Sequence, residues 1–281
     1  MPPSIGDNPA SMIPDRSASK KDVVPLTAAI GSFAAGLLLM IVAVRPLFAH
    51  FGMRGGLAAS ELVLVLPSLV LAVAVGVGRA GLIGIGRPTT RQWVLTALLS
   101  VALWLVAGGL LELQQLVVPF PPELLDQFRA LHAALQPKSV WDAVLSVAAI
   151  AIAPAVAEEL LVRGILLPSL DRAAPRTLAL VLSAAAFAGL HLDGYRMGFT
   201  FLLGLALGWL RLRSGTLLLP LFVHALFNSI TFLVAPFADD GTNATHPVAG
   251  LLILLAGLAF GVPLWRALDL SFEAAKTPNG G

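Results

Sequence analysis

The chain has 281 residues, of which 57% are hydrophobic and only 12% are charged, and its mean hydropathy is +0.87. Soluble domains carry about 25% charged residues, so this composition indicates an integral membrane protein. The absence of cysteine excludes disulfides, thiolate metal sites and a cysteine nucleophile. A net charge of only +2, with no basic stretch interleaved with aromatic residues, argues against a nucleic-acid partner.

The chain begins and ends in polar segments, residues 1–24 and 271–281. The first is rich in Pro and Ser and lacks the charged start and apolar core of a cleavable signal peptide, so we expect a disordered cytoplasmic tail. Between the two tails, residues 25–270 are expected to form a single integral-membrane domain. The lipid bilayer is therefore the first partner that the sequence implies.

A helix needs about 20 apolar residues to cross the hydrocarbon core of a bilayer. By that rule the sequence predicts an all-α, polytopic membrane helix bundle with about eight transmembrane helices. Between the third and fourth spans, residues 121–136 place their leucines on one face, which is typical of an amphipathic interfacial helix or of a packed connector. The expected spans are 25–47, 57–78, 92–118, 140–168, 176–192, 197–213, 216–235 and 247–267.

The positive charges indicate an orientation. Most of the 18 Lys and Arg residues fall in the two tails and in alternate connections between the spans. Because cytoplasmic segments are enriched in Lys and Arg, we expect both termini in the cytoplasm. Leu, Ala and Arg outweigh Ile and Lys, which favours a GC-rich bacterial genome and hence a bacterial inner (plasma) membrane.

Two adjacent acids, Glu158 and Glu159, stand inside the apolar span 140–168. A charged side chain at a helix centre costs about 2.5–3.5 kcal/mol on insertion scales, so such residues mark functional sites. Glu159 and Arg163 are four residues apart and can form an ion pair on one face of the helix. Glu158 points about 100° away and is free to face a cavity.

Helix rise places the polar residues of three spans in one band. Measured from the cytoplasmic ends of their helices at 1.5 Å per residue, Glu158 lies about 15 Å deep and His191 about 22 Å deep. His224 and Asn228 lie about 12 and 18 Å deep on a third helix. These depths predict one polar site near the middle of the membrane.

The same residues form three motifs. Glu-Glu-x-x-x-Arg ends at Arg163, Phe-x-x-x-His begins at Phe187, and His-x-x-x-Asn ends at Asn228. With the motifs in this order, the chain resembles the CPBP family, which comprises CAAX proteases and bacteriocin-processing enzymes and is also called the Abi family. The resemblance covers about residues 140–235.

The resemblance implies a metal-independent, glutamate-type intramembrane protease, a CAAX prenyl endopeptidase-like hydrolase without a cofactor. Its substrate would be a membrane-associated protein or peptide. By the family's assignment, Glu158 with His191 activates a water molecule, and His224 with Asn228 forms an oxyanion hole. The residues with supporting roles are Glu159, Arg163 and Phe187.

Other functions stay open. A zinc-dependent intramembrane protease could use Glu158, His191 and His224 as ligands, although no His-Glu-x-x-His helix is present. A proton-coupled transporter could use Glu158 as a relay, although no inverted repeat is visible. A non-catalytic immunity or scaffold protein is the third alternative. Outside the motifs, Glu61 and Glu112 fall near the ends of expected spans, where their side chains can reach the interface.

Overall fold

The computed structural model describes residues 23–238 and 246–275. Within these ranges the chain is helical, and its one β-bridge is isolated, so the all-α class is confirmed. Most of the tail expected at residues 1–24, and the end of the tail expected at 271–281, lie outside the described residues.

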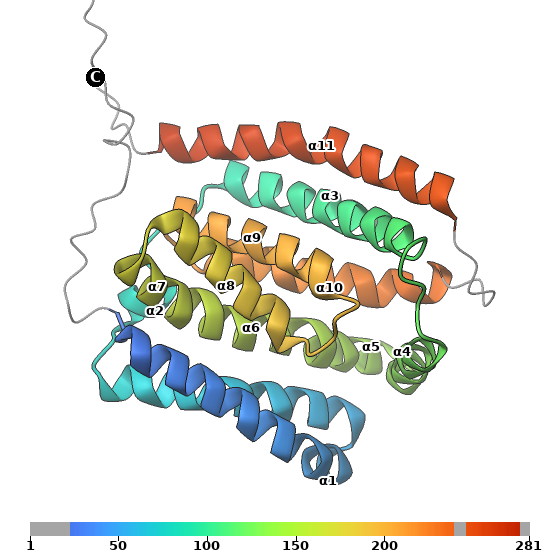
Figure 1. Ribbon diagram of the computed structural model, residues 1–281, viewed down its shortest axis with the longest axis horizontal. Helices are drawn as coiled ribbons and strands as arrows, with labels where there is room; N and C mark the ends of the chain where they lie inside the picture. Colours follow the sequence, from blue (N-terminus) through green and yellow to red (C-terminus); the bar gives the residue numbers. More distant parts are fainter. Residues whose placement is uncertain (1–22, 239–245, 276–281) are drawn as a thin grey trace, which may run out of the picture.

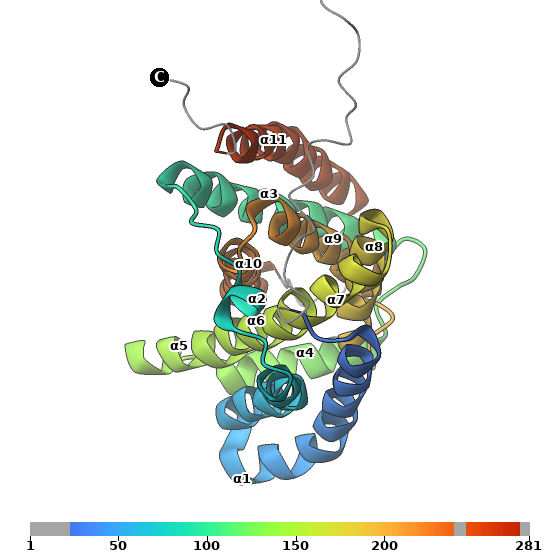
Figure 2. The ribbon, with the colours of Figure 1, turned by 90° about the vertical axis from the view of Figure 1, so that its left-hand side faces the viewer.

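The long helices lie roughly along one axis, and successive ones run in opposite directions (Figure 1). The first residues of α1 and the last of α11 lie at the same end of the bundle (Figures 1 and 2). In chain order the elements are α1 (Leu26–Ala74), α2 (Arg79–Ile83), α3 (Thr90–Gln114), α4 (Pro122–Leu135), α5 (Val140–Val147), the π-helix η2 (Ala148–Ile152), α6 (Ala153–Glu159), the π-helix η3 (Leu160–Leu166), α7 (Leu167–Ala173), α8 (Arg176–Leu190), α9 (Met197–Ser214), α10 (Leu218–Ala238) and α11 (Pro247–Ala274).

Four helices in the described ranges are long and apolar enough to cross a membrane, which supports an integral membrane protein. The expected count of about eight spans is not confirmed. The helix α8 and the apolar part of α10, Leu218–Val234, are shorter apolar helices, and α9 carries Arg211 and Arg213 in its last turn. The four candidates are Leu26–Ala74, Thr90–Gln114, Val140–Ala173 and Pro247–Ala274.

The helix α1 turns back on itself at Gly52 and covers both of the first two expected ranges (Figure 1). Gly52 has φ 68° and ψ −172°, a conformation that glycine adopts readily because it has no Cβ. The two arms pack closely: the Ser68 hydroxyl donates to the Ser32 hydroxyl over 2.9 Å. A Cβ built on Gly36 would lie only 2.1 Å from the carbonyl oxygen of Leu64.

The helix Val140–Ala173 contains two π-helical stretches, η2 and η3, on either side of α6. Pro154 follows η2, and Pro168 follows η3. Proline has no N–H and cannot donate to the carbonyl four residues earlier, and a wider turn accommodates this missing bond. The acidic end of α6 therefore lies between two wide turns, an arrangement that is frequent at functional sites.

The turn between α9 and α10 is tied to η3 and to the segment after α2. Gly215 ends α9 in the left-handed conformation, with φ 66°. The next residue, Thr216, forms an antiparallel bridge with Gly84. From the last turn of α9, Arg211 Nε donates to the Arg163 carbonyl over 3.2 Å. A side chain thus satisfies a backbone acceptor inside the π-helical stretch.

The helix α4 turns its predicted apolar face toward the rest of the protein. Leu135 is fully buried, and its carbonyl accepts a hydrogen bond from the Ser146 hydroxyl over 2.8 Å. Ser146 in turn accepts from Arg54 Nε over 2.8 Å. Earlier in α4, the Phe128 ring lies under the guanidinium of Arg196, 5.1 Å from its carbon. Of the two alternatives for this segment, these contacts favour the packed connector.

Candidate active site

The acidic pair ends α6, and both side chains are buried. Glu159 Oε1 accepts a hydrogen bond from Arg163 Nη1 over 2.6 Å, and neither side chain is exposed. Arg163 Nη2 donates to the carbonyl of Gly204 on α9 over 3.0 Å. The predicted Glu159–Arg163 ion pair is confirmed, and the bond to Gly204 gives it the additional hydrogen bonding that a buried pair needs.

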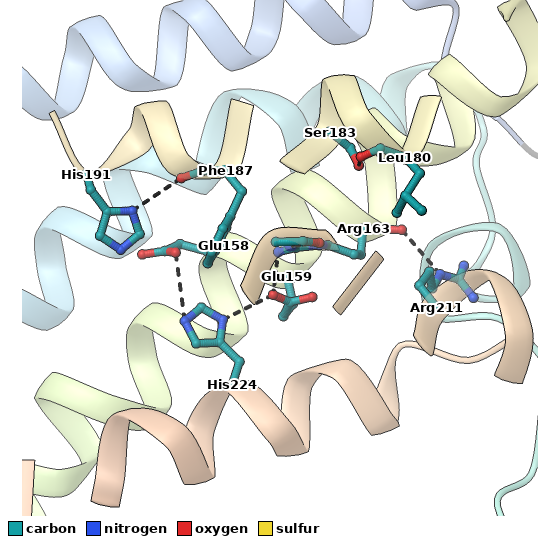
Figure 3. A network of polar contacts seen from close by, with 10 residues as sticks. Glu158, Glu159, Arg163, Leu180, Ser183, Phe187, His191, Arg211 and His224 are labelled. Atoms are coloured by element: carbon teal, nitrogen blue, oxygen red, sulfur yellow. Dashed lines mark hydrogen bonds and ion pairs between the residues drawn. The ribbon is translucent and has the colours of Figure 1, made fainter. Parts of the chain in front are cut away.

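His224 of α10 contacts the same carboxylate. Its Nδ1 lies 3.1 Å from Glu159 Oε1, and because an ionised carboxylate only accepts, this nitrogen carries a proton. Its Nε2 lies 3.9 Å from Glu158 Oε2, which is too long for a direct hydrogen bond. Glu159 therefore orients the imidazole of His224, and the second ring nitrogen is directed at Glu158 (Figure 3).

His191 is the residue that ends α8. Its Nδ1 lies 3.2 Å from the carbonyl oxygen of Phe187. A carbonyl only accepts, so this contact assigns the proton to Nδ1 and leaves the lone pair on Nε2. In Figure 3 the imidazole points toward the carboxylate of Glu158.

Phe187 sets the spacing of the polar groups around it. The side chain is fully buried, and its ring centroid lies 5.4 Å from that of His191 and 5.4 Å from that of His224, in edge-to-face geometry. The guanidinium carbon of Arg163 lies 4.3 Å from the same centroid. Aromatic pairs and cation–π contacts favour these geometries, so one phenyl ring fixes residues from three helices.

Glu158 differs from its neighbour in having no hydrogen bond. It is 8% exposed, and its buried Oε2 has no hydrogen-bond partner among the described residues. Glu159, by contrast, has one oxygen, Oε1, within hydrogen-bond distance of Arg163 and His224, and only its Oε2 lacks a partner. Buried polar atoms are nearly always paired, so an orphaned carboxylate oxygen beside two imidazoles requires an explanation, and a general base is one.

The structure brings together six of the seven residues singled out in the sequence. Asn228, the seventh, lies one turn beyond His224 on α10 and is half-buried. Within the described part of the chain, no hydrogen bond joins it to the other six. The six that converge are Glu158, Glu159, Arg163, Phe187, His191 and His224.

One further acid near the site, Glu61 of α1, is not expected there from the sequence. The helix α1 packs against α6, and Leu64, one turn after Glu61, belongs to the same core cluster as Ala157. The expected span began at residue 57, which put Glu61 near a membrane surface. The second arm of α1 instead begins just after Gly52, so Glu61 lies about 12 Å along it. Its three-residue spacing from the core residue Leu64 is the signal that could have revealed its direction.

The zinc alternative requires three side chains that converge on one ion. Among the described residues, no group of three His, Cys, Asp or Glu side chains could hold a metal ion. Of the three expected ligands, His191 and His224 each have one ring nitrogen in contact with an oxygen, that of the Phe187 carbonyl and that of the Glu159 carboxylate. Only the other nitrogen of each ring could bind a metal.

Comparison with known proteins gives one match. Residues 140–230 match the family model of type II CAAX prenyl endopeptidase Rce1-like proteins. This segment, from α5 into α10, contains all three motifs and every residue of the polar network described above. No curated protein and no solved structure matches the chain. Over residues 140–230, the chain is therefore similar to the Rce1-like family of type II CAAX prenyl endopeptidases.

Proposed function

We propose that the chain is an intramembrane endopeptidase in which Glu158 activates water to hydrolyse a peptide bond of a membrane-associated protein or peptide. The family match supports CAAX-type protease activity. The observation that carries the glutamate mechanism is the contrast between two adjacent acids. Glu159 Oε1 lies within hydrogen-bond distance of Arg163 and His224, and only its Oε2 lacks a partner, whereas among the described residues no hydrogen bond reaches the carboxylate of Glu158. This carboxylate is available to take a proton from water.

In the first step, water held between Glu158 and His191 attacks the scissile carbonyl carbon. A C–O bond forms, Glu158 takes one proton of the water, and the electrons of the carbonyl π bond move to its oxygen. The other O–H of the water stays intact and donates a hydrogen bond to His191 Nε2. This nitrogen is unprotonated because the proton of the ring is on Nδ1, which faces the Phe187 carbonyl. His191 thus aligns the attacking water with the bond that is to break.

The second step needs donors for the oxyanion. His224 donates from Nε2 in its doubly protonated form, with the negative charge of Glu159 3.1 Å from the other ring nitrogen. Asn228 supplies a second donor from its amide. A preorganised donor of this kind contributes about 2.7–4 kcal/mol to transition-state stabilisation in a comparable protease. When the intermediate collapses, the C–N bond breaks and Glu158 returns its proton to the leaving amine.

The test uses a quenched fluorescent peptide that ends in a farnesylated CAAX sequence, with the purified protein in proteoliposomes. We expect Glu158→Gln to abolish cleavage, because the amide keeps the shape of the side chain but cannot accept the proton. Glu123→Gln, at an exposed acid on α4, is the matched control and should cleave at the wild-type rate. If Glu158→Gln keeps more than roughly a tenth of the wild-type rate, Glu158 is not the base.

The same assay addresses the substrate class. Cleavage of the farnesylated peptide but not of the unmodified peptide would assign the prenyl group a role in recognition. Equal cleavage of the two peptides would show that the protein recognises membrane association and not the prenyl group. This result would favour leader peptides or membrane anchors as substrates.

A further inference from the structure

The carbonyl of Arg163 lies where its own helix has no donor to give it. In an α-helix the N–H of Leu167 would bond to this oxygen, but in the π register of η3 that N–H is bonded to the Val162 carbonyl, five residues earlier. The π-helical donor of the Arg163 carbonyl would be the N–H of residue 168, which is a proline and has none. Backbone acceptors inside a protein are nearly always paired, so this carbonyl requires a donor from another part of the chain.

Arg211, near the end of α9, provides this donor and binds a second carbonyl. Its Nε donates to the Arg163 oxygen over 3.2 Å, and its Nη2 donates to the Leu82 oxygen of α2 over 3.4 Å. The same Leu82 oxygen lies against η3, because a Cβ built on Gly164 would be 3.3 Å from it. The planar guanidinium carries several donors in fixed directions, which allows one side chain to bridge two backbone acceptors. Arg211 therefore joins α2, η3 and α9 at one point.

The helix α9 holds Arg163 by both its backbone and its side chain. About two turns before Arg211 on the same helix, the Gly204 carbonyl accepts from Arg163 Nη2 over 3.0 Å. The other terminal nitrogen of Arg163 donates to Glu159 Oε1 over 2.6 Å, and His224 Nδ1 lies 3.1 Å from that same oxygen. A continuous series of contacts thus runs from Arg211 to His224 (Figure 3).

We propose that Arg211 is a positioning residue of the active site, which keeps η3 in its π register and thereby fixes the side chain of Arg163 against Glu159. Without the guanidinium of Arg211, the Arg163 carbonyl recovers a hydrogen bond when the turn rewinds to the α register and takes the N–H of Leu167. Rewinding turns Arg163 about the helix axis, away from the two acceptors of its side chain. His224 then loses the fixed partner that orients its ring. This inference rests on the proposed role of His224 as an oxyanion donor.

Replacing Arg211 with methionine tests this role. Arg211→Met keeps an unbranched apolar side chain but removes every donor. The lost hydrogen bonds come from a charged group, so we expect kcat on the farnesylated CAAX peptide to fall by about 10–100-fold. KM should change by less than about threefold, because an oxyanion donor acts in the transition state more than in substrate binding. Arg211→Lys keeps the charge and a donor but not the donor geometry of the guanidinium, so its kcat should lie between those of Arg211→Met and wild type.

Arg213 offers the matched control, since it lies two residues later on α9 and has different partners. Its Nη2 donates to Glu273 Oε1 over 3.0 Å and is also paired with Asp269, both on α11. Arg213→Met therefore removes an arginine and two ion pairs from the same helix end, none of which involves η3. We expect this variant to keep the wild-type kcat. Equal losses of kcat in Arg211→Met and Arg213→Met would show a general weakening of this end of α9 and would overturn the proposal, as would a fully active Arg211→Met.

A readout without activity follows the His224 ring itself. The chain has five histidines, so nitrogen NMR of protein with isotope-labelled histidine gives few signals, and those that His224→Gln removes belong to His224. We expect Arg211→Met to shift the signal of Nδ1, which lies against Glu159, and Arg213→Met to leave it unchanged. An unchanged Nδ1 signal in Arg211→Met would overturn the proposal.

These results separate the inference from the proposed function. If Glu158→Gln is active, the proposed function fails, whereas the NMR comparison still decides the role of Arg211. An inactive Glu158→Gln beside a fully active Arg211→Met defeats the present inference alone. Where Arg211→Met does not fold, Arg211→Lys decides by the same two measurements. A lower kcat with a shifted His224 signal would support the proposal, whereas wild-type values of both would leave Arg211 a role in folding only and would overturn it.

Discussion

Glu158 and Glu159 are adjacent and chemically identical, but their carboxylates differ in the contacts that they make. Glu159 is bonded within its own helix to Arg163 and across helices to His224. Removing one member of a buried ion pair leaves an uncompensated charge, which costs about 3–5 kcal/mol. Glu159 is therefore tied to the stability of the fold, whereas Glu158 has no bond whose loss would unfold the protein, and is free for chemistry.

The proposed oxyanion donors can be separated by their contacts. His224 is bonded to Glu159 and directed at Glu158, whereas Asn228 has no bond to the site in the described part of the chain. Hydrogen bonds to a developing oxyanion act in the transition state more than in substrate binding. We expect Asn228→Ala to lower kcat by about 10²–10³ with little change in KM.

His224→Ala should lower kcat at least as far, because it also removes a partner of Glu159. The double variant should lose less than the product of the two single losses, since both side chains serve one oxyanion. If Asn228→Ala raises KM and leaves kcat unchanged, Asn228 contacts the substrate or packs against it, and the second donor lies elsewhere.

At this scale the sequence predicts contacts within a helix better than contacts between helices. The pairs Glu159–Arg163 and Phe187–His191 follow from a spacing of four residues. The bond from His224 to Glu159 joins residues 65 apart and depends on the rotation of two helices about their axes. The expected span starts at residue 57, whereas the second arm of α1 starts just after Gly52, and this difference moves Glu61 from the interface into the helix.

At the scale of elements, the hydrophobic pattern locates the helices and misses their irregularities. A period of 3.6 residues cannot reveal η2 and η3, although Pro154 and Pro168 were visible in the sequence as their causes. The reversal at Gly52, by contrast, falls between the first two expected spans, 25–47 and 57–78, so the pattern does locate this break. The expected count of spans relied on apolar length alone, whereas α8 is short and is supported by packing against α9.

The α1 hairpin offers a matched pair of glycines on one arm. A Cβ at Gly36 would lie 2.1 Å from the Leu64 carbonyl oxygen, whereas a Cβ at Gly31 would meet nothing within 4 Å. Gly36→Ala must push the arms apart, so we expect the free energy of unfolding to fall by about 1–3 kcal/mol. Gly31→Ala should raise it by up to about 1 kcal/mol through helix propensity. Thermal unfolding in detergent measures both.

The second arm of α1 carries Glu61. The substitutions at Gly36 and Gly31 therefore also test whether the position of this arm affects the candidate active site. Displacement of that arm by Gly36→Ala should also reduce cleavage of the farnesylated peptide, whereas Gly31→Ala should leave cleavage unchanged. Equal stabilities for the two variants would mean that the arms are not packed as closely as the Ser68–Ser32 hydrogen bond indicates.

At the scale of the whole molecule, both described ends of the chain lie at one end of the bundle (Figure 1). From the distribution of Lys and Arg, we expect that end to face the cytoplasm. The chain has no cysteine, so single cysteines can report on this without a background signal. Lys138 lies just before α5 and Ala173 ends α7, so the two residues lie at opposite ends of the candidate span Val140–Ala173. Both are exposed.

In intact cells, a membrane-impermeant maleimide should label Lys138→Cys and should not label Ala173→Cys. After permeabilisation both should react, which confirms that each thiol is accessible. The reverse pattern would invert the orientation and place both termini outside the cytoplasm.

The helix Val140–Ala173 is synthesised before the residues of α9 and α10 that its buried charges contact. Glu159 and Arg163 leave the ribosome together, but the Gly204 carbonyl that binds Arg163 comes 41 residues later, and His224 comes 65 residues after Glu159. At about 5–20 residues per second, the helix enters the bilayer seconds before these partners exist. During that interval only the internal ion pair shields its charges from lipid. Chains that stall before α9 would therefore expose a signal for membrane quality control, and catalytic competence would be among the last properties that the nascent protein acquires.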